Sequence, residues 1–275
     1  MNRGRSRLWD IATTALVILS GVFILLPILW VFLTAFKSEI DVYDLSLLFK
    51  PTVKNFREIF SNPQFKLGQA LGSSLIVAFS TIAIAIPVST LGAYGFARFR
   101  MIGGRLAFFS VLATQFVPAV VIIIPFFLLA RDLGMLDRHV TLIVINLAIV
   151  TPFAIWMIMG FIEGIPLDTE ESAMVDGAGR WRVIRDIVIP MAAPGIITAA
   201  IFSFILSWNE FLFALMISQQ DLRTWPITLA LFSDEQGVRW EYLSAAGVIA
   251  MAPMFVLALL IQKHFVKGMT MGAVR

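Results

Sequence analysis

Six runs of about 20 apolar residues are the feature that most limits how this sequence can fold. A helix that rises about 1.5 Å per residue needs about that length to cross the roughly 30 Å hydrocarbon layer of a membrane. Backbone groups in lipid must be hydrogen-bonded within their own segment, and the runs lack the alternation of barrel strands, so each is expected to be helical. The runs are Ile11–Leu33, Leu71–Tyr94, Leu106–Leu129, Val140–Phe161, Ala193–Ile217 and Leu243–Ile261. The sequence therefore predicts an all-α polytopic membrane protein with six transmembrane helices.

Composition narrows the possible chemistry. Hydrophobic residues make up 59% of the chain and charged residues 14%, which excludes an ordinary soluble domain. The net charge of +3 fits basic cytoplasmic loops and gives no reason to expect a nucleic-acid partner. There is no cysteine, and the two histidines, His139 and His264, are far apart, so no metal site is predicted. No Gly-Lys pair occurs, so we expect no phosphate-binding loop and no ATP hydrolysis by this chain itself.

Charged residues in the short loops predict the orientation. The loop after the second run, "ARFRMIGGR", has three arginines and no acid, whereas "ARDLGMLDRH", after the third, has equal numbers of acids and bases. Short basic loops stay in the cytoplasm, so both termini are predicted to be cytoplasmic. We expect a cytoplasmic N-terminus at 1–10, a transmembrane domain at 11–262 with a cytoplasmic loop at 163–192, and a cytoplasmic C-terminal tail at 263–275.

The stretch "EESAMVDGAGRWRVIRDIVIP" in this loop is the most polar part of the chain and predicts a helical hairpin. A first helix begins near Pro166, "DGAG" forms the turn, and a second helix runs from about Arg180 to Pro190, which ends it. Leu167, Met174 and Val175 share one face of the first helix with Glu171. Helices this short are not stable alone, so another surface is expected to pack against that face. The pattern leaves two alternatives open: the face lies on lipid headgroups, or it docks on a basic groove of a soluble partner.

Several motifs resemble one family over essentially the whole chain. Glu171-Ser172-Ala173, then Gly177 after three residues, then Ile189-Pro190, is similar to the E-A-A, Gly, hydrophobic-Pro signature of the membrane subunits of binding-protein-dependent ABC importers; Ser and Ile are departures. "GAYGFARFR", "SWNEFLFAL" and "FVKGMTMGAV" resemble the carbohydrate-uptake permeases of the maltose-system type. The resemblance implies the type I ABC importer permease fold, with the hairpin as the element that couples the permease to a cytoplasmic ATPase.

Coupling roles are carried over to the matching positions as implications of the resemblance. Glu171 would contact a groove of the ATPase and Gly177 would form the turn. The predicted coupling residues are Glu170, Glu171, Ala173, Asp176, Gly177, Ala178, Gly179, Arg180, Trp181 and Pro190.

A translocation path is predicted from polar residues within the runs. Helical spacing puts Ser203, Ser207 and Glu210 on one face of the fifth run, which we expect to meet the cavity or a neighbouring permease, with Asn209 off that face. The alternative, nearly as well supported, is that these side chains bond their own backbone or another helix. Further candidates for the path are Gln115, Asn146 and Thr151.

The resemblance implies a permease subunit of an ATP-driven importer that takes a sugar or sugar derivative from an extracytoplasmic binding protein into the cytoplasm. The implied partners are a second permease, a different chain by the family pattern, a homodimeric ATPase that carries ATP and Mg²⁺, the binding protein and the lipid of a bacterial inner membrane. Two alternatives come from other classes: an ion-coupled secondary transporter, disfavoured by the scarcity of ionisable residues in the runs, and a membrane scaffold.

Overall fold

The computed structural model describes residues 3–219, 221–234 and 237–272, with side chains from 9 to 233 and from 237 to 259 inside these ranges. The chain forms two compact units, Met1–Phe65 with Leu229–Ala252, and Lys66–Thr228 with Pro253–Arg275. Each unit is described by itself.

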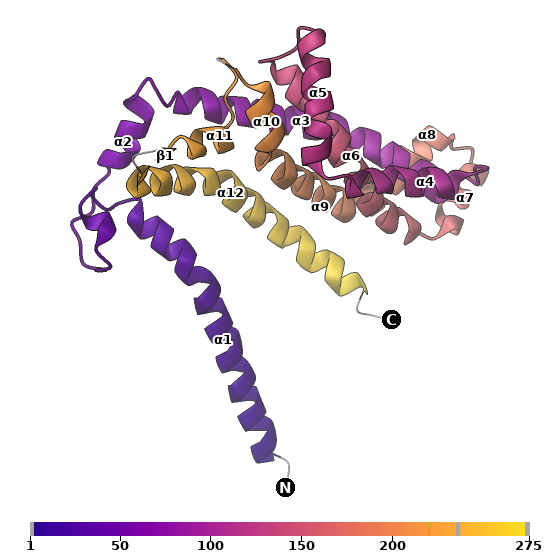
Figure 1. Cartoon of the computed structure of the whole chain (residues 1–275). Helices are drawn as coiled ribbons and strands as arrows, with labels where there is room; N and C mark the ends of the chain where they lie inside the picture. The colour runs from indigo at the N-terminus through magenta and orange to yellow at the C-terminus, as the bar shows by residue number, and fades with distance from the viewer. Residues whose placement is uncertain (1–2, 220, 235–236, 273–275) are drawn as a thin grey trace. The chain divides into compact units, whose positions relative to one another are not determined.

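The first unit contains a long N-terminal helix and the segments that follow it (Figure 1). Asn55 lies in the helix Lys54–Ser61 and binds the segment just after the N-terminal helix. Its Nδ2 donates to the carbonyl oxygens of Ala35 at 2.9 Å and Lys37 at 2.8 Å. The Tyr242 hydroxyl donates to Glu58, and this hydrogen bond is the main reason that the pKa of Glu58 lies below its ordinary value. The elements are α1 (Arg3–Thr34), η1 (Asp41–Tyr43), α2 (Lys54–Ser61), the antiparallel strands β1 (Ser233–Asp234) and β2 (Gly237–Val238), and the start of α12 (Trp240–Gly272).

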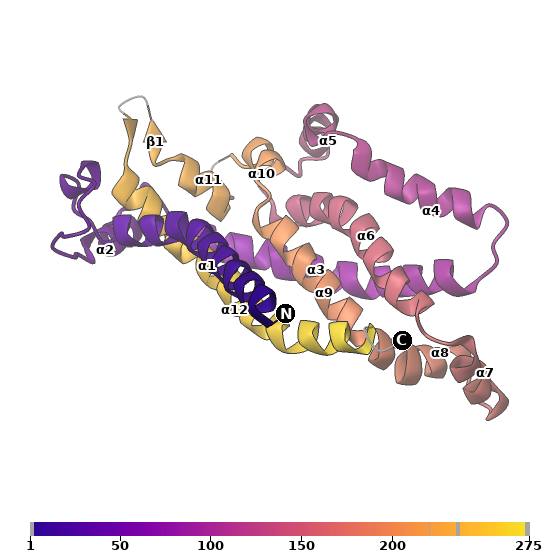
Figure 2. The same cartoon turned by 90° about the horizontal axis from the view of Figure 1, so that it is seen from below.

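The second unit is built on three helices that pack against one another: α3 (Leu67–Arg98), α6 (His139–Glu163) and α9 (Ile189–Trp208) (Figure 2). Small residues let these helices approach closely. Gly195 of α9 faces Phe161 of α6 so closely that a Cβ built on Gly195 would lie 2.7 Å from the Cβ of Phe161. The buried side chains of this core are Ala93, Tyr94, Ala154, Ile155, Ile158, Ile162, Ile165, Val183, Ile184, Val188, Ala192 and Ala199.

The third predicted span is bent rather than straight. It consists of α4 (Gly104–Ala113), the short turn η2 (Thr114–Phe116) and α5 (Ala119–Asp132), and its two parts meet at 93°. Val117 and Pro118 are both extended at the bend. Proline disfavours helical backbone in the residue before it, so the helix ends where Pro118 follows Val117. The span predicted over Leu106–Leu129 is thus made of two helices with a break at Pro118.

The predicted limits of the fifth helix are also wrong at both ends. Pro190 does not end a helix: α8 (Arg180–Val183) continues through a π-helical segment, η3 (Ile184–Val188), into α9. In that segment the Ile189 N–H donates to the carbonyl of Ile184, five residues back, and the helix continues past Pro190 although proline has no N–H to donate. At the other end, α9 stops at Trp208, and a separate helix, α10 (Leu212–Ile217), follows.

The described residues contain five helices long and apolar enough to cross a membrane, or six if the bent pair forms one span. This confirms the helical fold class. The predicted N-terminal segment, 1–10, and the predicted C-terminal tail, 263–275, are largely helical where the structure describes them, because α1 begins at Arg3 and α12 ends at Gly272. Residues 1–2 and 273–275, and the side chains of the predicted tail at 263–275, lie outside the described residues.

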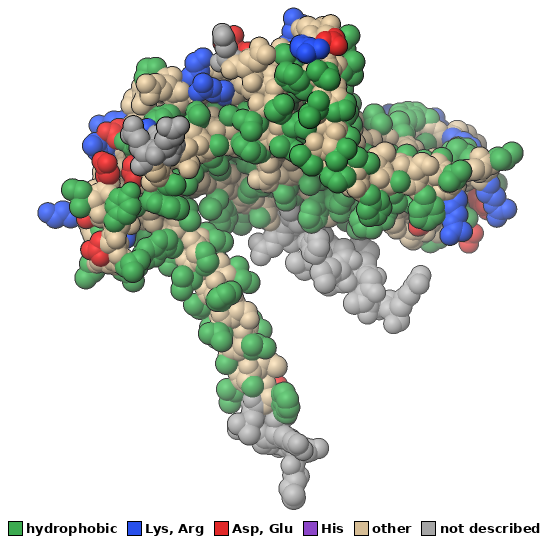
Figure 3. Space-filling view, in the orientation of Figure 1, with side chains coloured by type: hydrophobic (Ala, Val, Ile, Leu, Met, Phe, Trp, Pro, Cys, Tyr) green, Lys and Arg blue, Asp and Glu red, His purple; other side chains and the backbone are tan. Residues whose placement is uncertain are grey.

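Apolar side chains cover the outside of the helices (Figure 3). On α1, Val17, Leu19 and Phe23 are exposed, and Ile76 and Phe79 of α3 are exposed likewise. Apolar surface on this scale needs an apolar medium or a partner. It therefore agrees with helices that lie in lipid.

We predict that Gly195→Ala destabilises the chain by about 1–3 kcal/mol, because the added methyl group would overlap Phe161 in the contact between α6 and α9. Thermal unfolding of the purified chain in detergent would show a lower Tm. Gly160→Ala is the matched control, since a Cβ there meets nothing within 4 Å. An equal Tm for both variants would contradict the tight contact.

Candidate functional site

The hairpin predicted in the 163–192 loop is present. Its first helix is α7 (Leu167–Val175), and its second limb is α8 with η3. The turn closes α7 with two hydrogen bonds, from Gly177 N–H to the Met174 carbonyl at 3.1 Å and from Ala178 N–H to the Ala173 carbonyl at 3.0 Å. This pattern requires a left-handed residue just after the helix, and Gly177 supplies it with φ of +88°. The glycine thus fixes the turn between the two limbs.

An ion pair holds the inner face of α7. The Glu170 side chain is 3% exposed, and its Oε1 lies 2.7 Å from Nε of Arg98, the last residue of α3. Its Oε2 accepts a hydrogen bond of 3.1 Å from the Tyr94 hydroxyl. Both carboxylate oxygens are therefore satisfied by groups of α3.

The same guanidinium also binds the end of α6. Arg98 Nη2 donates to the carbonyls of Ile162 and Ile165, both at 2.8 Å. The Ile162 carbonyl, in the last turn of α6, also accepts the Ile165 N–H at 3.0 Å, so Arg98 adds a second donor there and also binds the connection beyond the helix. One side chain thereby joins α3, the α6–α7 connection and α7.

The second limb is attached by a different contact. The Arg180 guanidinium lies 4.9 Å from the ring centroid of Phe99, which follows α3, and Phe99 packs edge-on against Tyr94 at 6.1 Å. Below it, Val183 and Val188 are buried in the core shared with α6. Both limbs thus rest on the C-terminal end of α3.

The outer face of the hairpin is exposed and mixed in character. Leu167, Glu171 and Val175 lie along α7, with Val175 87% exposed, and Trp181 of α8 is 64% exposed. Figure 3 shows charged side chains gathered at this end of the unit. The hairpin, which is attached to α3 on its inner side, thus exposes apolar groups and a carboxylate on its outer side. Such a surface suits the docking of another protein.

The predicted hairpin residues are divided between these two faces. Glu170 is buried, and two small residues, Ala173 and Ala178, are half-buried against the core. The exposed members are Glu171, Asp176, Gly177, Gly179, Arg180, Trp181 and Pro190. Glu170 is among the predicted coupling residues, and both of its carboxylate oxygens are bonded within the chain. Sequence reasoning missed Arg98 and Tyr94 as its partners. The only signal for them was their place in "GAYGFARFR", about 70 residues before the hairpin.

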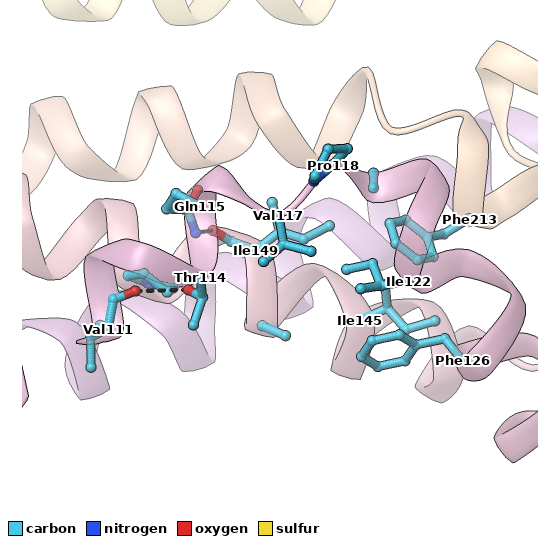
Figure 4. Close-up of a pocket in the computed structure, with 13 residues that line it drawn as sticks. Val111, Thr114, Gln115, Val117, Pro118, Ile122, Phe126, Ile145, Ile149 and Phe213 are labelled. Carbon is cyan, nitrogen blue, oxygen red and sulfur yellow. Dashed lines mark hydrogen bonds between the residues drawn. The ribbon is translucent and has the colours of Figure 1, made fainter. Parts of the chain in front are cut away.

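A cavity of about 690 Å³ lies at the α4–α5 bend, where this segment faces α6 (Figure 4). Phe126 and Ile122 of α5 and Phe213 of α10 line one part, and Thr114 and Gln115 line the other. Gln115 Nε2 donates to the Ile149 carbonyl of α6 at 2.9 Å, which links the bent segment to that helix. The cavity is mostly apolar with few polar groups.

Most other predicted path residues lie elsewhere. Asn146 is buried and donates to the Leu142 carbonyl of its own helix at 2.8 Å, and the Thr151 carbonyl accepts from the Ser89 hydroxyl at 3.3 Å. Ser203 and Ser207 are buried in the interior of the chain. These two side chains therefore face the interior of this chain and do not lie on its surface.

Glu210 is not on that face, because α9 ends at Trp208 and Asn209 begins an irregular segment. Its carboxylate accepts the backbone N–H groups of Phe213 at 2.7 Å and Ala214 at 3.0 Å. Glu210 thus satisfies the unpaired donors at the start of α10. Asn209 is exposed and bonds the Ile205 carbonyl.

No group of three or more His, Cys, Asp or Glu that could hold a metal ion occurs within the described parts of the chain.

Comparisons with known proteins agree with this architecture. The family described as "Binding-protein-dependent transport system inner membrane component" matches residues 85–271. The sulfoquinovosyl glycerol transport system permease protein of Agrobacterium fabrum is 31% identical, with 95% of this chain and 91% of the relative covered. The trehalose/maltose transport system permease protein of Thermococcus litoralis is 30% identical, with 94% of each covered. A chain of a bacterial alginate ABC transporter, solved with an alginate pentasaccharide-bound periplasmic protein, has the same fold, with a TM-score of 0.71 at 19% identity and 95% of both chains covered.

We predict that Glu210→Ala lowers the free energy of unfolding by about 1–2 kcal/mol, because two N–H groups of α10 lose their acceptor. Thermal unfolding in detergent measures the change. Asn209→Ala is the control and should change the free energy by less than about 0.5 kcal/mol, since this side chain is exposed. Equal stability of the Glu210 variant and the parent chain would exclude a capping role.

Proposed function

We propose, from the premise that this chain belongs to the family of inner membrane components of binding-protein-dependent transport systems, that it moves a sugar or sugar derivative into the cytoplasm. The observation that carries this proposal is the hairpin, whose exposed outer face is supported by a buried attachment to the transmembrane helices. A rigid element of this kind can transmit a rigid-body motion, whereas a flexible loop cannot.

The substrate class is supported by the relatives. Two of them are transport permeases for trehalose or maltose and for sulfoquinovosyl glycerol, all glycosides. The cavity at the α4–α5 bend combines aromatic and apolar walls with Gln115 and Thr114, and a sugar presents both an apolar ring face and hydroxyl groups. We place part of the path at this cavity.

Energy would come from a partner. The chain would not be catalytic, and ATP and Mg²⁺ would be bound by two copies of a cytoplasmic ATPase that contacts the hairpin. Glu171, Gly177 and Trp181 lie on the exposed side or at the turn and are the proposed centre of that contact. A second permease, a different chain, and an extracytoplasmic binding protein complete the assembly. Both termini and the hairpin would be on the cytoplasmic side of a bacterial inner membrane.

Reconstitution in liposomes tests the proposal. The assembly is this chain with its partner permease and ATPase, with ATP inside the vesicles and the binding protein outside. Radiolabelled maltose, trehalose and sulfoquinovosyl glycerol are the probes. Uptake of one of them that requires both ATP and the binding protein is the expected result. Uptake driven by an ion gradient without ATP would instead indicate a secondary transporter, and no uptake by either route would favour a scaffold.

We predict that Gly177→Val reduces uptake per ATP hydrolysed by about tenfold. The residue has φ of +88°, and a β-branched side chain in the left-handed region is strained by about 1–2 kcal/mol or more, so the turn would shift the docking face. Gly160→Ala is the control, because Gly160 lies outside the hairpin and has open space at its Cβ position. Normal uptake per ATP by the valine variant would contradict the assignment of the turn.

A further inference from the structure

We propose that Arg98 is a positioning residue that locks the hairpin to the transmembrane helices, so that displacement of the hairpin moves α3 and α6 with it. The inference rests on the proposed function, because it concerns how a motion imposed on the outer face reaches the spans. Arg98 itself lies on the inner side of the hairpin and need not touch the ATPase.

The connection between α6 and α7 is the place where a lock is needed. After Glu163 only three residues, Gly164, Ile165 and Pro166, precede α7. A short connection with a glycine is free to act as a hinge unless its backbone groups are held. If it bent, α7 would turn against α6 and the motion would be lost at the hinge.

Arg98 binds acceptors before, within and beyond this connection. Its Nη2 binds the carbonyl of Ile162 before the connection and that of Ile165 within it, both at 2.8 Å. Its Nε binds the Glu170 carboxylate beyond the connection at 2.7 Å. The planar guanidinium fixes the directions of these bonds, so the three acceptors are held in one arrangement. A lysine would keep the charge, but its ammonium group is a compact donor that does not reproduce this fork.

Two further observations favour a lock over a simple ion pair. Tyr94, one helical turn before Arg98, binds the second oxygen of Glu170, so the carboxylate cannot rotate freely. Arg180, on the other limb, stacks over Phe99, which directly follows Arg98. Two adjacent residues at the end of α3 thus hold both limbs, and the hairpin cannot turn about either limb alone.

Distance measurements between two spin labels test the lock directly. The chain contains no cysteine, so Ile84→Cys on α3 and Asp168→Cys on α7 introduce the only labelling sites. Both positions are exposed, and 14 residues of helix separate Ile84 from Arg98, about 21 Å along the axis. The labelled chain is measured in nanodiscs, alone and in the assembly without nucleotide and trapped with ATP and vanadate.

With Arg98 in place we expect one narrow distance distribution that is the same in all three states. Arg98→Lys should broaden it and should lower uptake of the accepted sugar probe per ATP hydrolysed by about tenfold. Glu170→Gln, which keeps the shape of the side chain, should have a smaller effect in the same direction. Arg100→Lys is the matched control, an exposed arginine two residues away, and should leave both measurements unchanged.

Each other outcome counts against the inference. A narrow distribution and unchanged uptake per ATP in Arg98→Lys would overturn it. A smaller amount of assembled protein with unchanged uptake per ATP would show a purely structural role and would also overturn it. If the parent assembly shows no uptake dependent on ATP, the proposed function fails, while the label distances in the chain alone still decide whether Arg98 locks the hairpin.

Discussion

The buried ion pair between Arg98 and Glu170 is the interaction on which the hairpin depends. Removal of two charges from water is expensive, and a buried pair repays that cost only if its remaining donors and acceptors are also satisfied. Here Tyr94 bonds the second carboxylate oxygen, and Nη2 of the guanidinium bonds the carbonyls of Ile162 in α6 and Ile165 in the connection after it. The pair is therefore better explained by the position it imposes on α7 than by any net stability. A helix of nine residues has little stability of its own to set that position.

The two sides of the hairpin differ in burial and bonding, which explains its mixed sequence. The inward side carries Glu170 and Ala173, a charge with a partner and a small residue that packs on the core. The outward side carries Leu167, Glu171 and Val175, which have no such cover within the chain. The adjacent Glu170 and Glu171 thus have different surroundings, because successive residues of a helix point about 100° apart. The exposure of the side chains distinguishes Glu170 from Glu171, whereas their residue type is the same.

The apolar runs predicted the helical class and the approximate place of five spans, since length and hydropathy are local properties of the sequence. The hairpin was also predictable, from Pro166 and the glycine turn. The failures concern backbone breaks and long-range partners. Pro118 bends its span by 93°, whereas Pro87, Pro125, Pro152 and Pro194 lie inside continuous helices, so proline alone does not mark a break. Arg98 and Glu170 are 72 positions apart, and no periodicity connects residues at that distance.

Each of the two breaks in the apolar runs has a polar side chain beside it. Gln115 bonds a carbonyl of α6 beside the α4–α5 bend, and Glu210 accepts two N–H groups where α9 gives way to α10. Groups exposed by a break in a helix must find partners, because water is scarce in the apolar interior. A polar residue in a span is therefore as much a sign of interrupted backbone as of a substrate contact. Both breaks border the same cavity, which Phe213 of α10 and Pro118 of the bend line together. The cavity therefore lies where the helices are broken, and Glu210 lowers the free-energy cost of the second break by accepting N–H groups that it leaves unpaired.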